Sequence, residues 1–178
     1  MTDIIQQIDQ HLLYFIHDIT QCSFLDKAMP LITSLGNGGA FWILLALILL
    51  LRRDTRKSGL AMGAAMLLCF LFGNIWLKNF IARPRPYTVD PSIALLIKPS
   101  SEPYSFPSGH TMNAFSAAFA LMLREEGHWR AAVLLAELIA FSRIYLMMHY
   151  PLDIVGGVIV AYAAAYIVNC CITYLENR

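Results

Sequence analysis

Long stretches without a charged residue constrain the fold of this chain more than any other feature of its sequence. These stretches cover residues 28–51, 58–77 and 154–175. A helix needs about 20 mostly apolar residues to cross the hydrocarbon core of a bilayer, and each stretch supplies that length. Only 14% of the 178 residues are charged, whereas about a quarter are charged in a typical soluble domain. The sequence therefore predicts an all-α, polytopic membrane protein.

Two further apolar segments bring the expected number of transmembrane helices to five. They cover residues 107–123 and 131–148, and the second contains Glu137 and Arg143. Because carboxylates within a membrane usually face the interior of the bundle, we expect Glu137 to make a structural hydrogen bond there. At this length a single integral membrane domain, residues 1–178, is the natural prediction.

The first twenty residues have a different pattern, in which apolar side chains recur at helical spacing with polar ones between them. The apolar residues are Ile4, Ile5, Ile8, Leu12, Phe15, Ile16 and Ile19. This pattern is typical of an amphipathic helix that lies in the membrane interface. A sixth, irregular span is the alternative, and it is disfavoured because too many polar side chains would face lipid.

The connecting segments predict how the chain is oriented in the cell membrane. Residues 52–57, RRDTRK, form a short and strongly basic loop, which should be cytoplasmic. Alternation of the spans then places residues 78–107 and 143–153 together on the opposite, extracytoplasmic face. The net charge of +1 argues against nucleic acid as a partner, because nucleic acid requires a strong basic excess.

Three polar clusters fall on that extracytoplasmic face. They are KNFIARPRP (residues 78–86), PSGH (residues 107–110) and SRIYLMMHYPLD (residues 142–153). Taken singly, each has an ordinary structural explanation. Lys78 can end a span with its charge at the interface, RPRP can form a stiff turn, and Ser108 can cap a helix.

Together, the clusters supply the groups of a phosphoryl-transfer site. Lys78, Arg85 and Arg143 concentrate positive charge, and arginine binds phosphate oxygens bidentately. A histidine held by a carboxylate through one ring nitrogen leaves the other nitrogen free as a nucleophile or base. A second histidine can donate a proton to a leaving oxygen. We expect no metal ion, because three nearby cations would repel Mg²⁺ or Zn²⁺.

These clusters resemble the three signature motifs of the type 2 phosphatidic acid phosphatase superfamily, which also includes vanadium haloperoxidases. The first family motif is Lys, six residues and Arg-Pro, which matches residues 78–86. The second is Pro-Ser-Gly-His, which matches residues 107–110. The third is Ser-Arg, five residues, His, three residues and Asp, which matches residues 142–153. Every internal gap is kept, and the matched core covers residues 78–153.

The resemblance implies a role for each matched residue. His149 would attack phosphorus and form a phosphohistidine, Asp153 would orient its ring, and His110 would protonate the leaving group and then activate water. The phosphoryl oxygens would be held by Lys78, Arg85, Ser108, Gly109 and Arg143. Arg83 lies outside the motifs, and it would either help to bind a second phosphate or contact headgroups. The resemblance implies a phosphatase that works without a metal, and we expect no cofactor.

The substrates implied by the family are lipid phosphates, namely isoprenoid diphosphates such as undecaprenyl diphosphate, phosphatidylglycerophosphate, phosphatidic acid or lipid A phosphates. Among them we expect undecaprenyl diphosphate, since the compact chain with short loops resembles a bacterial member. Two alternatives stay open. A lipid phosphotransferase would use the same residues, and a membrane transporter or lipid-binding protein would use the cationic pocket only for recognition. The five apolar segments exclude a soluble haloperoxidase.

Overall fold

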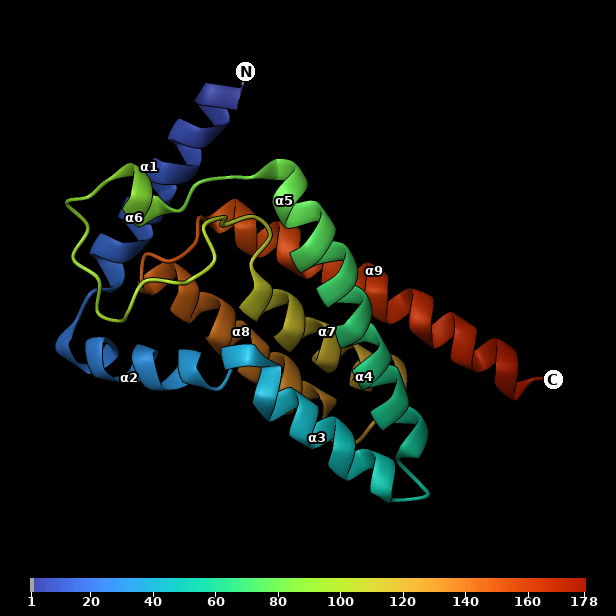
Figure 1. The fold of residues 1–178 in the computed structure, drawn as a ribbon. Coiled ribbons are helices and arrows are strands. Elements are labelled where there is room, and N and C mark those ends of the chain that lie inside the picture. Colours follow the sequence, from blue (N-terminus) through green and yellow to red (C-terminus); the bar gives the residue numbers. More distant parts are fainter. Residues whose placement is uncertain (1) are drawn as a thin grey trace.

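The computed structural model describes residues 2–178, with side chains from Ile4 onward, and it is built from helices joined by irregular segments (Figure 1). The elements are α1 (Thr2–Thr20), α2 (Ser23–Ser34), the short helical turn η1 (Asn37–Gly39), α3 (Ala40–Leu51), α4 (Arg56–Cys69), the π-helical stretch η2 (Phe70–Leu77), α5 (Lys78–Ile81), α6 (Pro86–Val89), α7 (Gly109–Leu123), α8 (Trp129–Tyr145) and α9 (Pro151–Glu176). Within the described residues, β pairing is limited to one isolated bridge between Pro84 and Tyr104. The all-α prediction is confirmed.

Helix α7 is the centre of the bundle, and it packs against α4, α8 and α9 (Figure 1). The contact with α9 is close because α9 presents small residues to it. A Cβ atom on Gly157 would lie 3.1 Å from the side chain of Thr111 and 3.3 Å from the carbonyl oxygen of Ser108. Gly157, in the second turn of α9, therefore lets the start of α9 approach the start of α7, and both helix starts carry residues of the predicted site.

Among the described residues, two helices are long and apolar enough to cross a membrane, the continuous segment Arg56–Ile81 and α9. A third candidate is the pair formed by α2 and the segment from η1 to Leu51, which meet at a bend of 42°. The apolar run at residues 28–51 is therefore broken rather than straight. Helices α7 and α8 have 15 and 17 residues, and the count of five spans stays a prediction.

The N-terminal helix α1 has the amphipathic pattern that the sequence predicts. Its apolar side chains at Ile5, Ile8, Phe15 and Ile19 are exposed, whereas Asp9 and Leu13 on the opposite face are buried. The inward face packs against α8 and α9. Its location in a membrane interface stays a prediction.

The expectation for Glu137 is wrong. Its side chain is exposed on α8 rather than turned into the bundle. The face of α8 that packs inward carries Ala132, Ala136, Ile139 and Ala140, at the spacing of one helical stripe. Glu137 follows Ala136 directly and so lies outside this stripe.

The two ends of the bundle differ in character. At one end, the Glu176 carboxylate near the end of α9 pairs with Lys57 at 3.0 Å and with Arg124 at 2.8 Å. Lys57 follows the RRDT turn between α3 and α4, and Arg124 follows α7, so these connections and the C-terminus lie together. The α5–α6 region and the long segment that follows it lie at the other end (Figure 1).

Candidate active site

The segment between α8 and α9 folds into a turn that places His149 against the end of α8. The amide of Met148 donates to the carbonyl of Arg143 at 3.0 Å, and the amide of Met147 donates to that of Ile144 at 2.9 Å, as in a Schellman ending. Met147 has a φ of 56°, where glycine is usual, and a side chain in that conformation costs about 1–2 kcal/mol. The turn returns the chain at once to the bundle, where His149 is buried.

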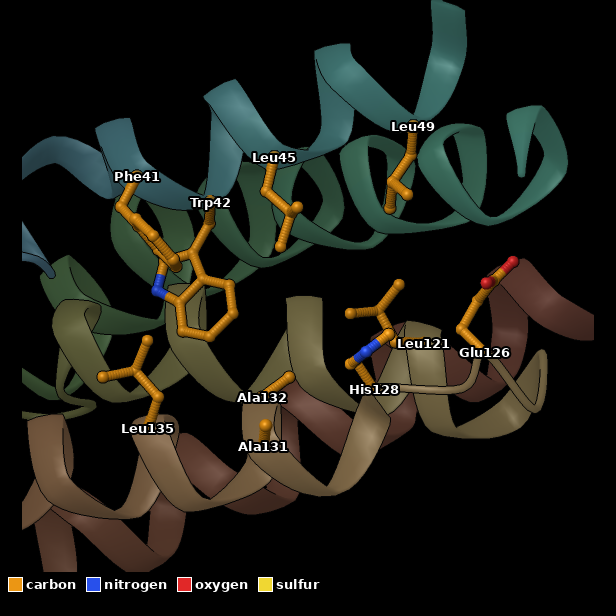
Figure 2. Close-up of a pocket in the computed structure, with 10 residues that line it drawn as sticks. All are labelled: Phe41, Trp42, Leu45, Leu49, Leu121, Glu126, His128, Ala131, Ala132 and Leu135. Carbon is orange, nitrogen blue, oxygen red and sulfur yellow. The ribbon is translucent and has the colours of Figure 1, made fainter. Parts of the chain in front are cut away.

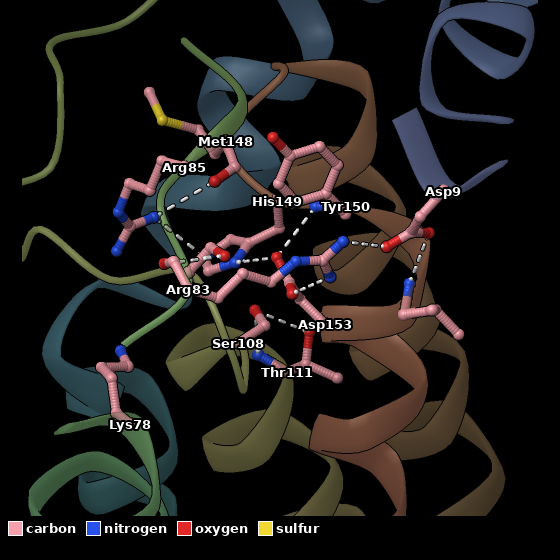
Figure 3. A network of polar contacts seen from close by, with 12 residues as sticks. Asp9, Lys78, Arg83, Arg85, Ser108, Thr111, Met148, His149, Tyr150 and Asp153 are labelled. Carbon is pink, nitrogen blue, oxygen red and sulfur yellow. Dashed lines mark hydrogen bonds and ion pairs between the residues drawn. The ribbon is translucent and has the colours of Figure 1, made fainter. Parts of the chain in front are cut away.

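The Asp153 carboxylate, in the first turn of α9, holds the His149 ring. Its Oδ2 accepts a hydrogen bond from the Tyr150 amide at 2.9 Å and lies 3.3 Å from Nδ1 of His149. Its Oδ1 accepts a hydrogen bond from Arg83 at 2.7 Å. One carboxylate therefore caps α9 and orients the imidazole, as Figure 3 shows.

The RPRP segment, residues 83–86, brings Arg85 to the free side of the same imidazole. Pairing of this segment with residues 104–105 holds it extended. The Arg85 guanidinium donates to the carbonyl of Met148 at 3.2 Å and lies 3.2 Å from Nε2 of His149. The imidazole thus has a carboxylate at one nitrogen and a cation at the other.

Ser108 is the N-cap of α7. Its Oγ accepts a hydrogen bond from the Thr111 hydroxyl at 3.0 Å, and its amide donates to the carbonyl of Asp153 at 3.1 Å. Two residues further on, Nε2 of His110 lies 3.0 Å from Oδ1 of Asn37 in η1. Ser108 is fully buried, so the structure shows its capping role, and its contact with a phosphoryl oxygen stays a prediction.

These segments enclose a cavity of about 310 Å³. Six of the eight predicted site residues line it: Lys78, Arg85, Gly109, His110, Arg143 and His149. The other two lie behind its wall, Ser108 as the cap of α7 and Asp153 against His149 (Figure 3). Its lining residues Lys78 and Arg85 come from the α5–α6 region, which lies at the end of the bundle away from the RRDTRK loop (Figure 1). The cavity therefore lies at that end.

The three cations around the cavity are only partly neutralised by protein groups. Lys78 Nζ donates to the carboxylate of Glu102 at 2.6 Å. Arg143 donates from one terminal nitrogen to the Thr33 hydroxyl at 2.7 Å, and its Nε is buried without a partner among the described residues. A buried donor without a partner costs free energy, and an anion in the cavity would supply the missing acceptor.

His149 is held in the form that a nucleophile needs. Burial, reinforced by the positive charges of Arg85, Arg143 and Lys78, lowers the pKa of His149 well below its usual value. The imidazole is therefore neutral at physiological pH. With Asp153 accepting from Nδ1, the lone pair is on Nε2, the nitrogen that faces Arg85 and the cavity.

The structure adds four polar residues that the motifs did not reveal. Asn74 and Asn113 line the cavity, one helical turn from Lys78 and His110 respectively, so a helical face drawn through the motif residues could have found them. Glu102 comes from an irregular segment and Asn37 from the short turn η1, where sequence spacing carries no such signal. Among the side chains of residues 4–178, no group of three or more His, Cys, Asp or Glu lies close enough to hold a metal ion.

A second cavity, of about 300 Å³, lies between α3, α7 and α8 (Figure 2). Its wall is mostly apolar, with Trp42, Leu45 and Leu135 among the lining residues, and Glu126 and His128 lie at one end. No residue of the predicted site lines this cavity. The second cavity is therefore separate from the predicted site.

The fold and the site define an all-helical protein with apolar membrane-type helices and a cavity lined by three cationic side chains and two histidines. The sequence matches the PAP2 superfamily over residues 56–176. It is 29% identical over 147 residues to the undecaprenyl-diphosphatase of Sulfolobus acidocaldarius, covering 82% of this chain and 69% of the relative. It is 31% identical over 143 residues to the undecaprenyl-diphosphatase BcrC of Bacillus subtilis, covering 78% and 70%.

The crystal structure of Aquifex aeolicus LpxE has the same fold, with a TM-score of 0.76 at 29% identity over 89% of this chain and 92% of that one. The chain belongs to the PAP2 superfamily, as the three motifs predict. It is a phosphoric ester hydrolase of the lipid phosphatase type.

Proposed function

We propose that this protein hydrolyses an isoprenoid diphosphate, with undecaprenyl diphosphate as the first candidate, at the extracytoplasmic face of the cell membrane. The observation that carries the proposal is the convergence of Lys78, Arg85, Arg143, His110 and His149 on one cavity from four separate segments of the chain. The undecaprenyl-diphosphatases among its relatives support the choice of substrate.

The geometry supports a two-step reaction. In the first step Nε2 of His149 attacks the terminal phosphorus, the bond from phosphorus to the bridging oxygen breaks, and His110 protonates that oxygen as the lipid monophosphate leaves. In the second step His110 accepts a proton from water, which attacks the phosphohistidine, and inorganic phosphate is released. Lys78, Arg85 and Arg143 balance the charge on the phosphoryl oxygens throughout.

An apolar groove beside the cavity favours a lipid as the substrate. This groove, of about 440 Å³, lies between α3 and α4 and has Ile43, Leu47 and Leu67 among its lining residues. It shares Gly38, Phe70 and Asn113 with the wall of the cavity. An isoprenoid or acyl chain in the groove would leave the headgroup at the three cations. A soluble phosphate ester would make no use of this surface.

Phosphate release from detergent-solubilised protein tests the proposal. Undecaprenyl diphosphate, farnesyl diphosphate, phosphatidylglycerophosphate and phosphatidic acid are assayed side by side in excess EDTA. We expect the two isoprenoid diphosphates to be hydrolysed fastest, with no loss of rate in EDTA. His149→Ala should reduce turnover at least about a thousandfold, as the loss of a nucleophile does elsewhere. A short-lived, acid-labile phosphoenzyme should form in the unaltered protein.

His128→Ala is the matched control, because His128 lies at the second cavity and should leave turnover unchanged. Full activity in His149→Ala would exclude the proposed nucleophile. Transfer of labelled phosphate to an added lipid alcohol in place of water would identify a phosphotransferase. Binding of these lipids without turnover or phosphoenzyme would indicate a binding or transport protein.

A further inference from the structure

The Arg83 guanidinium does not face the cavity, although it belongs to the same RPRP segment as Arg85. It is absent from the lining of the cavity and lies 4.1 Å over the ring of Tyr150. One terminal nitrogen donates to Asp153 at 2.7 Å, and the other donates to Asp9 at 2.6 Å and to Gln6 at 2.7 Å. With its hydrogen bonds directed at protein groups, Arg83 is not placed to bind a second phosphate or a headgroup.

Asp9 reaches Arg83 from α1, far away in the sequence. The residue is only 2% exposed, and its second oxygen, Oδ1, accepts a hydrogen bond from the Leu152 amide at 3.1 Å. Leu152 directly precedes Asp153. Asp9 therefore contacts both Arg83, which is the ion-pair partner of Asp153, and the backbone next to Asp153. Figure 3 shows Arg83 between the two carboxylates.

The charges of Asp9, Arg83 and Asp153 together determine how well the protein supports positive charge on His149. Arg83 alone would neutralise Asp153, and a neutralised carboxylate would give the imidazole little support as it gains positive charge on bonding to phosphorus. Asp9 supplies a second negative charge, which leaves the trio of Asp9, Arg83 and Asp153 with a net charge of −1. Buried charges are weakly screened, so the net negative charge of the trio stabilises positive charge on the His149 ring.

We propose that Asp9 is a positioning residue of the hydrolase, which acts through Arg83 to hold the Asp153 carboxylate in place and negatively charged against His149. The amphipathic helix α1 then contributes a positioning residue to the active site in addition to its exposed apolar face. This inference rests on the proposed function of His149. It assigns Arg83 to the carboxylate side of the imidazole, away from the substrate.

The test is steady-state kinetics of Asp9→Asn with farnesyl diphosphate in detergent, together with the rate of phosphoenzyme formation in a single turnover. The asparagine keeps an oxygen for the Leu152 amide and removes the charge. We expect kcat and the phosphorylation rate to fall about ten- to a hundredfold, as when the outer partners of oriented histidines are changed. KM should stay within about twofold, because no contact with the substrate changes.

Asp90→Asn is the matched control. Asp90 accepts a hydrogen bond from Tyr14 of α1 at 2.6 Å. Removing its charge weakens this contact of α1 without touching the charge trio, so kcat should stay within about twofold. Asp9→Glu restores the charge and should recover kcat above that of Asp9→Asn. If Asp9→Asn does not fold, Arg83→Lys serves instead, because a lysine cannot bridge two carboxylates in this way.

The outcomes separate the inference from the function on which it rests. Wild-type kcat in Asp9→Asn, with His149→Ala inactive, would overturn the role of Asp9 and leave the hydrolase intact. A parallel fall of kcat in Asp9→Asn and Asp90→Asn would also overturn it, since loosening of α1 would then be sufficient. Phosphate release that does not depend on His149 would instead overturn the proposed function.

Discussion

At the scale of single residues, the central feature is an imidazole held between opposite charges. Nδ1 of His149 lies 3.3 Å from Asp153, and Nε2 lies 3.2 Å from Arg85. The family resemblance predicted the first contact, because it implied that Asp153 orients the His149 ring. The second contact depends on the path of the RPRP segment, which no local spacing encodes.

This setting predicts the pH dependence of the reaction. The pKa of His149 is lowered by burial and by neighbouring cations, and the nucleophile must be unprotonated, so activity is lost only when the pH falls through that lowered value. We therefore expect kcat/KM for farnesyl diphosphate to show no acid limb near about 6.5, the ordinary pKa of histidine. A pH profile between neutral and acid conditions measures this. An acid limb at the ordinary value would show that His149 is solvated and free of its neighbours.

At the scale of elements, the segment between α6 and α7 places a carboxylate at the mouth of the cavity. Glu102 pairs with Lys78 at 2.6 Å, and its backbone carbonyl accepts a hydrogen bond from Arg85 at 2.8 Å. In the proposed site this carboxylate competes with a phosphoryl oxygen for Lys78. Substrate binding is therefore weakened by the negative charge of Glu102.

Replacing this carboxylate should tighten anion binding. Glu102→Gln removes the competing charge and keeps the backbone contact with Arg85. Because the Glu102 side chain is 54% exposed, solvent screens the pair, and we expect only about a threefold lower inhibition constant for orthovanadate, within the range of exposed ion pairs. Inhibition of farnesyl diphosphate hydrolysis measures it. Weaker vanadate binding would instead make Glu102 part of the anion site.

The broken helix pair α2–α3 shows why some elements could not be predicted. Hydropathy over residues 28–51 indicated one uninterrupted span, yet the chain bends at η1, where Gly38 and Gly39 have φ values of 59° and 68°. Glycines within an apolar run hardly change its mean hydropathy, but they alone adopt such angles readily. The contact between Asn37 and His110 also lies at this bend, so hydropathy did not predict that contact either.

At the scale of the whole molecule, the three motifs correctly predicted that distant segments of the chain lie close together. Hydropathy was a poorer guide to the shape of the membrane-spanning helices. Lys78, His110 and His149 line one cavity, as expected for groups at one end of neighbouring helices. The exposed Glu137 and the charge trio that begins at Asp9 were not predicted. Both depend on how helices rotate and pack against each other, which a single sequence does not specify.

The two ends of the bundle differ, and this difference predicts how the molecule is oriented in the membrane. Residues 52–57 and the C-terminus lie at one end of the bundle and the cavity lies at the other, so a cytoplasmic basic loop requires an extracytoplasmic cavity. The four cysteines are free, and a variant without them allows single cysteines to be placed at exposed positions. A membrane-impermeant maleimide should label Ala94→Cys in intact spheroplasts.

Asp54→Cys, in the basic loop, is the matched position at the opposite end. It should react only after the membrane is permeabilised, because the reagent cannot cross the bilayer. Both variants should react equally in detergent, which controls for the intrinsic reactivity of each thiol. Labelling of Asp54→Cys in intact spheroplasts, with Ala94→Cys protected, would place the catalytic cavity in the cytoplasm. Hydrolysis would then take place in the inner leaflet, and the extracytoplasmic face in the proposed function would be wrong while the chemistry of His149 could stand.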